Sequence, residues 1–162
     1  SWTAFFTVIL TSLTSKSVVS FTFVFILSCK SADKSFITVS EPTTKLTKIL
    51  TRDNKHDIEN MYRRMCFNVF AHNRDDHSKN FTYLYEADED KWHLSPAYDL
   101  TYSNSLGGEH ATTVNGNGIN PDIDDLLSVA KRIGLNVAES KKTALNIKEC
   151  VYEMLHEYIS TR

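Results

Sequence analysis

The alternation of apolar and polar positions predicts an amphipathic helix in the middle of the chain. Between residues 57 and 71, apolar side chains recur at steps of three and four, the repeat of a helix with one buried face. We expect Asp53 or Asp57 to cap its start and Ala71 to lie near its end. The buried stripe should comprise Ile58, Met61, Tyr62, Met65, Cys66, Val69 and Phe70, with Glu59, Asn60, Arg63, Arg64 and Asn68 on the other face.

A polar loop, His72–Asn80, follows this helix and precedes a pattern typical of a β-hairpin. We expect strands at Phe81–Tyr85 and Trp92–Leu94, with the acidic segment Glu86–Lys91 as the turn between them. The chain then continues to Asp99, just beyond the second strand. Loops held between rigid elements often carry catalytic residues. The segment before the hairpin is therefore the first candidate for a functional site.

The N-terminal part of the chain has a different pattern. Residues 1–29 are rich in Ser, Thr, Val and Phe, and Lys16 interrupts any apolar window of the ~20 residues that a membrane-spanning helix needs. Two interpretations stay open. Either the segment forms β-prone core strands or a truncated start, or it is a lipoprotein-like signal in which Val18–Leu27 is the apolar region ahead of Cys29. Residues 31–54 are polar and irregular, which favours connecting structure with one short helix.

Composition narrows the class of protein only a little. The chain has 162 residues, enough for one domain, and its formal net charge of -2 gives no electrostatic reason to expect direct binding to nucleic acid. The cysteines Cys29, Cys66 and Cys150 are widely spaced and form no zinc-type pair. We therefore expect a protein of the reducing cytoplasm that binds neither nucleic acid nor membrane.

The spacing of polar residues around the hairpin matches the needs of phosphoryl transfer. Asp75 and Asn80 form a D-x-x-x-x-N pattern, and Asp99 follows the hairpin. Transfer from ATP needs a carboxylate that orients the acceptor hydroxyl and oxygen ligands that hold Mg²⁺ against the phosphates. In the catalytic loop of protein kinases the Asp and Asn of this pattern have these two roles. The pattern predicts Asp75 beside the hydroxyl, with Asn80 and Asp99 as metal ligands.

Three longer segments resemble one family of kinases. Phe67–Tyr85 resembles the N-x-D-x-H-x-K-N-F catalytic loop of HipA-type protein kinases. Trp92–Leu100 resembles the segment that replaces D-F-G in that family, with Asp99 as the metal ligand. Gly107–Leu135 resembles the stretch that follows, including a Glu-His pair, an Asn-Gly turn and a helix that begins with Asp. The catalytic-loop motif is present as Asn73, Asp75, His77, Lys79, Asn80 and Phe81.

This resemblance implies a fold, a reaction and partners. The fold would be α+β and mainly α, a kinase-like C-terminal lobe with a β-hairpin between the catalytic loop and the metal-binding Asp. The reaction would be ATP- and Mg²⁺-dependent phosphorylation of protein Ser/Thr by a toxin–antitoxin kinase. Its partners would be a protein substrate and a DNA-binding antitoxin or a separate small-lobe chain. The implied catalytic residues are Asp75, His77 and Lys79, and the implied cofactor and metal ligands are Asn80 and Asp99.

The first 50 residues depart from the family pattern. They show no glycine-rich phosphate loop and no identifiable strand lysine, so we divide the chain into an unassigned segment, 1–50, and a HipA-like lobe, 51–162. A small lobe normally covers the phosphates of ATP and positions the transferred group. We therefore expect little kinase activity from the chain alone. A remnant without catalysis, which binds an antitoxin or a second lobe, is the main alternative.

Local interpretations of the same residues stay open. His72, Asp75, Asp76 and His77 crowd imidazole and carboxylate groups together, as in the metal site of a hydrolase. The two aspartates are also typical of a capped turn. His77 suits a structural role in which its ring bonds carbonyls and shapes the loop. Phe81 and Tyr98 are expected to be core aromatics.

Overall fold

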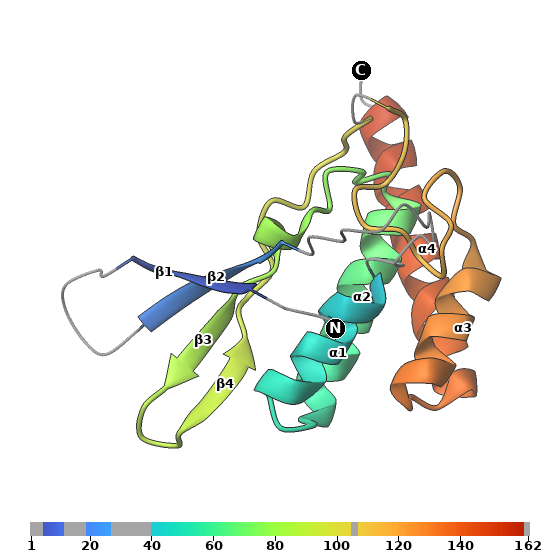
Figure 1. The fold of residues 1–162 in the computed structure, drawn as a ribbon. Coiled ribbons are helices and arrows are strands. Elements are labelled where there is room, and N and C mark those ends of the chain that lie inside the picture. Colours follow the sequence, from blue (N-terminus) through green and yellow to red (C-terminus); the bar gives the residue numbers. More distant parts are fainter. Residues whose placement is uncertain (1–4, 12–18, 27–39, 105–106, 161–162) are drawn as a thin grey trace, which may run out of the picture.

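The computed structural model describes residues 5–11, 19–26, 40–104 and 107–160. Within these parts the chain is mainly helical, with one antiparallel sheet on one side of the helices (Figure 1). This agrees with the α+β class expected from the sequence. In chain order the elements are β1 (Phe5–Thr11), β2 (Val19–Ile26), α1 (Ser40–Leu50), α2 (Lys55–Phe70), a 3-10 helix (Ser78–Asn80), β3 (Tyr83–Glu86), β4 (Lys91–Leu94), α3 (Ile123–Ile133) and α4 (Val137–Ser160).

The described strands form a four-stranded sheet in the order β1-β2-β3-β4. β3 and β4 form the hairpin predicted between the loop and Asp99, with Tyr83 opposite Leu94 and Glu86 opposite Lys91. β2 pairs with the other side of β3, where Val19 lies opposite Tyr85. Within the described sheet β3 is therefore an inner strand and β4 an edge strand, and β2 also lies beside the 3-10 helix of the polar loop.

The N-terminal strands agree with the prediction of β-prone segments. β1 and β2 pair along their lengths, from Phe5 opposite Ile26 to Thr11 opposite Ser20. β2 covers most of the apolar region that the signal interpretation needed, whereas Lys16 and Cys29 lie outside the described residues. Among the described helices, none is both long enough and apolar enough to cross a membrane.

Helix α2 is the centre of the helical layer. All seven apolar residues predicted for its stripe are buried, and most of them pack with α3 and α4 in one cluster. The predicted cap is wrong: the side chain of Asn54, not Asp53 or Asp57, accepts a hydrogen bond from the first turn, at the Asp57 N–H. Asp57 is instead buried, and its Oδ1 accepts a hydrogen bond from the Leu94 N–H of β4 at 3.3 Å.

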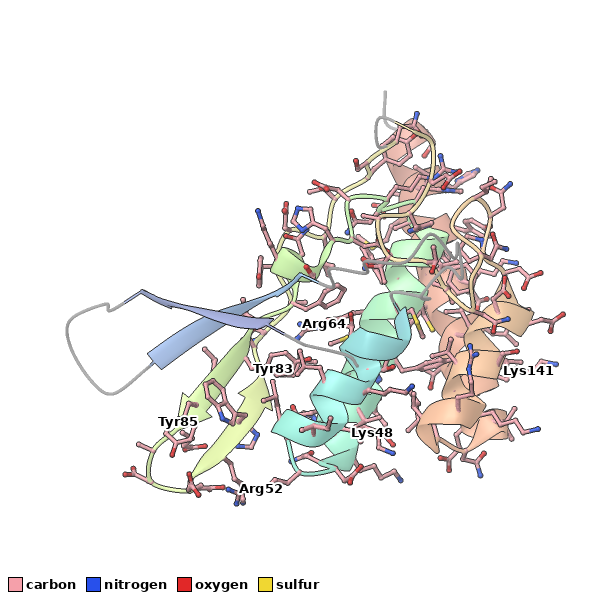
Figure 2. All side chains as sticks on the ribbon, in the orientation of Figure 1. Lys48, Arg52, Arg64, Tyr83, Tyr85 and Lys141 are labelled. Carbon is pink, nitrogen blue, oxygen red and sulfur yellow. The ribbon has the colours of Figure 1, made fainter. Side chains whose placement is uncertain are left out.

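A second apolar cluster joins the sheet to α1 and α2. Phe81, Tyr83 and Leu94 pack there against Met61 of α2, with contributions from α1. The Tyr83 side chain points from β3 toward α1 (Figure 2), where its hydroxyl bonds the buried Thr47 hydroxyl at 2.7 Å. Burial of the phenol raises its pKa to about 12, so the group stays neutral and able to donate. This contact fixes the hairpin, and with it the loop and Asp99, against the helical layer.

Helix α3 begins with an aspartate cap, as the family resemblance implied. Asp122 caps α3 by accepting from the Asp124 and Asp125 N–H groups at 2.9 and 3.1 Å. Gly134 ends α3 with a left-handed φ of 85°, a conformation that glycine adopts without steric cost. α4 packs against both α2 and α3.

Candidate functional site

Asn73 ties the polar loop after α2 to the segment that carries Asp99. It is 2% exposed, and its Nδ2 donates to Asn68 Oδ1 at 3.0 Å and to the Asp99 carbonyl at 3.4 Å. Its backbone also forms a β-bridge with Ser103. Asn68 was predicted on the exposed face of α2, but it is buried because it accepts this bond. The two segments are therefore held together although they are far apart in sequence.

Asp76 provides a second anchor for the loop. Its side chain is 4% exposed, with Oδ2 at 3.1 Å from His110 Nδ1 and Oδ1 accepting from the Thr112 N–H at 2.9 Å. The Thr112 hydroxyl also donates to the Asp76 carbonyl. His110 is also buried. The carboxylate thus bonds to a segment more than thirty residues away, rather than capping its own turn.

Asp75 has the opposite environment. Its side chain is 57% exposed, and the ring of His77 lies beside it, with Nε2 at 3.5 Å from Oδ1. His77 Nδ1 is buried without a hydrogen-bond partner, so the carbonyl-bonding role expected for this ring is not observed. Lys79 is exposed. The exposed Asp75 carboxylate is thus accessible to a large substrate, whereas Asp76 beside it is not.

Asn80 and Asp99 line one small cavity between the loop, the end of α2 and the segment after β4. The Asn80 Nδ2 group donates to the Asp75 carbonyl at 2.7 Å, which fixes the amide with Oδ1 left without a bond to a described residue. Asp75 does not line the cavity with its side chain. The loop therefore brings Asn80 to Asp99, and Asp75 contributes a backbone bond that orients Asn80.

Asp99 has an uncommon backbone conformation. Its φ of 53° lies in the left-handed region, which costs a non-glycine residue of order 1–3 kcal/mol and recurs at functional sites. The hydrogen bond from Asn73 to its carbonyl supports this conformation. Asp99 lines the cavity, and no described residue makes a hydrogen bond or ion pair with its carboxylate. Its oxygens are therefore available as ligands.

The donor set fits Mg²⁺. This ion prefers oxygen ligands, takes one or two carboxylates from the protein and fills its other positions with water and phosphate oxygens. Asn80 Oδ1 and the Asp99 carboxylate supply two such oxygens in one cavity, and neither is engaged within the described parts of the chain. An ATP-bound Mg²⁺ could thus bind both oxygens without breaking a hydrogen bond to either of them.

Arg64 of α2 and Tyr98 form other parts of the cavity wall. The Arg64 guanidinium donates to the Ser95 carbonyl, and burial lowers its pKa, although an arginine stays charged at neutral pH. Tyr98 was expected in the core, yet it is 41% exposed, because its hydroxyl donates to the Lys79 carbonyl at 2.7 Å at the surface. Phe81 is buried as predicted.

The metal-hydrolase hypothesis required the imidazoles and carboxylates of the loop to converge. Within the described residues, the one group of three or more potential ligands that lies close enough for a metal is elsewhere, on the β3–β4 hairpin. The loop residues diverge instead, since Asp76 bonds to His110 while Asp75 lies beside His77. The geometry therefore does not support a hydrolase site in this loop.

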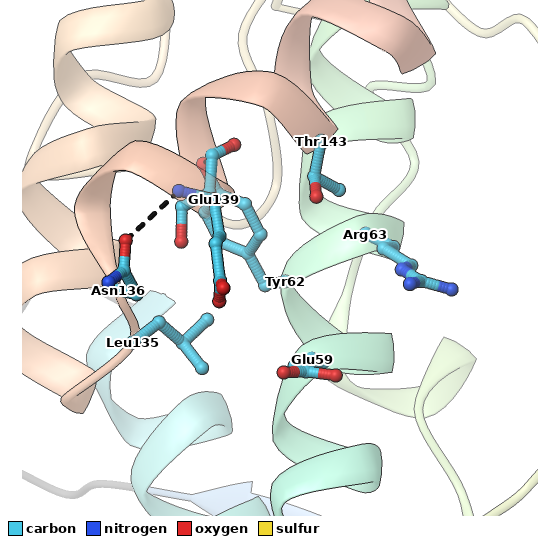
Figure 3. Close-up of a pocket in the computed structure, with 8 residues that line it drawn as sticks. Glu59, Tyr62, Arg63, Leu135, Asn136, Glu139 and Thr143 are labelled. Carbon is cyan, nitrogen blue, oxygen red and sulfur yellow. Dashed lines mark hydrogen bonds between the residues drawn. The ribbon is translucent and has the colours of Figure 1, made fainter.

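A second, polar cavity lies between α2 and the start of α4 (Figure 3). Glu59 and Arg63 of α2 and Glu139 of α4 line it, and the Glu139 N–H donates to Asn136 Oδ1 at 3.1 Å. None of the residues predicted for catalysis or metal binding lines this cavity. We therefore place the candidate site at the cavity of Asn80 and Asp99.

Sequence reasoning missed the anchoring residues of this site. Asp76, His110 and Thr112 form a buried network, and Arg64 lines the cavity from α2. The adjacent Asp-Asp pair and the Glu-His pair were visible in the sequence, but periodicity does not show which member of each pair is buried. The contact of Asp76 with His110 and Thr112 depends on the path that the chain takes after β4.

Comparison with known proteins identifies the family. A family model described as the HipA-like C-terminal domain matches residues 20–158, which is most of the chain. A search of curated proteins gives no match. The matched range includes the loop, the hairpin, Asp99, α3 and all but the last two residues of α4. The division at residues 50 and 51 stays a prediction. The chain belongs to the family of proteins with a HipA-like C-terminal domain.

Proposed function

We propose that the chain carries the catalytic loop and the metal ligands of a protein Ser/Thr kinase that uses ATP and Mg²⁺. The observation that supports this most strongly is the shared cavity of Asn80 and Asp99, whose side-chain oxygens are free of bonds to described residues. Membership of a family associated with kinase toxins is consistent with the same chemistry. The proposed acceptor is a protein hydroxyl, and a DNA-binding antitoxin or a small-lobe chain is the proposed partner.

The environment of each residue suggests its role in the proposed reaction. Asn80 and Asp99 hold Mg²⁺, which, when bound with ATP, supplies neutralisation of the phosphate charge. Asp75, with its exposed carboxylate, orients the acceptor hydroxyl and accepts its proton. His77 lies at 3.5 Å from that carboxylate and limits its movement. The exposed Lys79 adds positive charge where the phosphoryl group would arrive.

Nucleotide binding by variants tests this division without a need for turnover. Calorimetric titration of the chain with ATP at saturating Mg²⁺ should show binding that Asp99→Ala weakens at least about tenfold, because a charged ligand is lost. Asn80→Ala should weaken it less, since a neutral ligand contributes less. Asp75→Asn should leave it within about twofold. Asp88→Asn, which removes an exposed carboxylate of the hairpin turn, is the matched control.

The outcomes separate the kinase proposal from its main alternative. A folded chain without ATP–Mg²⁺ binding would support the non-catalytic remnant. Loss of binding in Asp75→Asn together with full binding in Asp99→Ala would reverse the two roles. Retained binding in Asp75→Asn, with Asp99→Ala impaired and Asp88→Asn normal, is the result that supports the proposal.

A further inference from the structure

The β3–β4 hairpin presents a second group of potential metal ligands, remote from the polar loop. Glu86 lies opposite Lys91 in the ladder, so Glu86 and His93 are diagonal neighbours on one face of the hairpin. Glu89 belongs to the turn between the strands. One ligand atom from each of Glu86, Glu89 and His93 lies within 4.8 Å of the others. A zinc ion at about 2.1 Å from each ligand would require about 3.4 Å between them, which small rotations of two half-exposed glutamates can supply.

A buried carboxylate behind His93 is an independent sign of a metal site. The Asp57 side chain is 5% exposed, and its Oδ2 has no hydrogen-bond partner but lies at 3.4 Å from His93 Nδ1. Its Oδ1 is already held by the Leu94 N–H at 3.3 Å. The other ring nitrogen of His93, Nε2, faces Glu86 Oε2 at 3.5 Å. A carboxylate on one imidazole nitrogen with the other nitrogen facing outward is the arrangement that orients metal-binding histidines.

The neighbouring charges show which carboxylates are available. Asp90 is engaged, because its oxygens accept from Tyr85 at 2.6 Å and Arg52 at 2.9 Å. Glu89 Oε2 accepts from Lys91 Nζ at 2.9 Å, and this hydrogen bond lowers the pKa of the carboxyl, so it is ionised at neutral pH. Lys91 would have to move aside for a cation, which its 46% exposed side chain allows.

We propose that Glu86, Glu89 and His93 bind a divalent transition-metal ion of the zinc type, with Asp57 orienting the histidine. One imidazole and two carboxylates suit such an ion better than Mg²⁺, and three protein ligands leave a fourth position for water. The ion would link the hairpin turn to β4, and through Asp57 to the first turn of α2. This site is independent of the proposed kinase function and lies on different residues from the Asn80–Asp99 cavity.

Zinc titration of the full chain tests the proposal. Competition with a chromophoric chelator at neutral pH should show one saturable site, and zinc should raise the melting temperature, because a ligand that binds only the folded state stabilises it. His93→Gln should weaken binding at least about a hundredfold, and Asp57→Asn about 10–100-fold, as for other partners of metal-binding histidines. Lys91→Gln should tighten binding. Asp88→Asn, in the same turn, should leave it within about twofold.

Loss of zinc binding in a variant must be distinguished from misfolding of that variant. Asp57 is buried and the His93 ring lies beside its Oδ2, so Asp57→Asn and His93→Gln both count only if their circular dichroism matches that of the wild type. Absence of a saturable zinc site in the folded wild type overturns the proposal. Equal zinc affinity in wild type and His93→Gln overturns it as well. ATP–Mg²⁺ binding in His93→Gln should be unchanged, so the failure of either proposal is recognisable separately.

Discussion

Replacement of Asp76 by alanine should destabilise the fold strongly, whereas the same change at Asp75 should not. Asp76→Ala leaves the buried Thr112 N–H and His110 Nδ1 without their partner, and these bonds are 2.9 and 3.1 Å long. Loss of one partner from a buried pair costs about 3–5 kcal/mol. Two hydrogen bonds to a charged group, at about 1.5–3 kcal/mol each, give a similar sum.

Asp75 is the matched control because it is the adjacent residue with the same side chain. It is 57% exposed, and among the described residues the one ion pair of its carboxylate is with His77, at 3.5 Å. Exposed pairs of this kind contribute about 0–1 kcal/mol. Since a domain of this size is stabilised by about 5–15 kcal/mol, the loss at Asp76 would be a large fraction of the total.

Urea denaturation followed by far-ultraviolet circular dichroism measures both variants. The midpoint should fall markedly for Asp76→Ala and little for Asp75→Ala, with an unchanged slope if only stability is affected. Thermal melts should show a decrease of about 6–20 °C for Asp76→Ala, at about 2–4 °C per kcal/mol. Equal losses in the two variants would refute the assignment of Asp76 as the anchor and Asp75 as the free carboxylate.

Three further predictions concern other parts of the chain. Asp122→Ala should lower the free energy of unfolding by about 0.5–2 kcal/mol in denaturant titrations, because it removes the cap of α3. Asp124→Ala should lower it less, because the Asp124 carboxylate does not cap the helix, and equal losses would contradict the capping geometry. Iodoacetamide at neutral pH should label the exposed Cys150 and not Cys66, because burial raises the pKa of the Cys66 thiol to about 12. Peptide mass spectrometry would detect the labels, and rapid labelling of Cys66 in the folded chain would refute its burial. The chain alone should transfer little phosphate from radiolabelled ATP to a protein substrate, because its sequence shows no glycine-rich loop to cover the phosphates; robust transfer that Asp75→Ala abolishes would show this expectation wrong.

Local patterns were enough to predict the elements around the site. The three- and four-residue repeat of α2 and the acidic turn between two strand-like runs are properties of contiguous residues, and both elements formed as expected. The position of Asn80 at the end of the loop and of Asp99 after the hairpin followed from the same order. These features depend on backbone periodicity, which the sequence carries directly.

Tertiary contacts decided the remaining features. Asn54 and its aspartate neighbours are equally good caps by residue type, and only the approach of β4 shows that Asp57 is used elsewhere. Asn68 is buried because Asn73 bonds to it. The burial of Asp76 could not be predicted from the sequence, since its partner His110 lies on a segment whose path no local pattern predicts.

We propose that Asn80 and Asp99 together hold the metal of a bound nucleotide. A crystal structure of the chain with Mn²⁺ and a non-hydrolysable ATP analogue tests it directly, because Mn²⁺ replaces Mg²⁺ and gives an anomalous signal. We predict a peak at coordination distance from Asn80 Oδ1 and the Asp99 carboxylate, with the phosphates of the analogue completing the shell. Nucleotide bound at another position, or a peak at His93 with none at Asp99, would show that Asn80 and Asp99 do not hold the metal of the nucleotide.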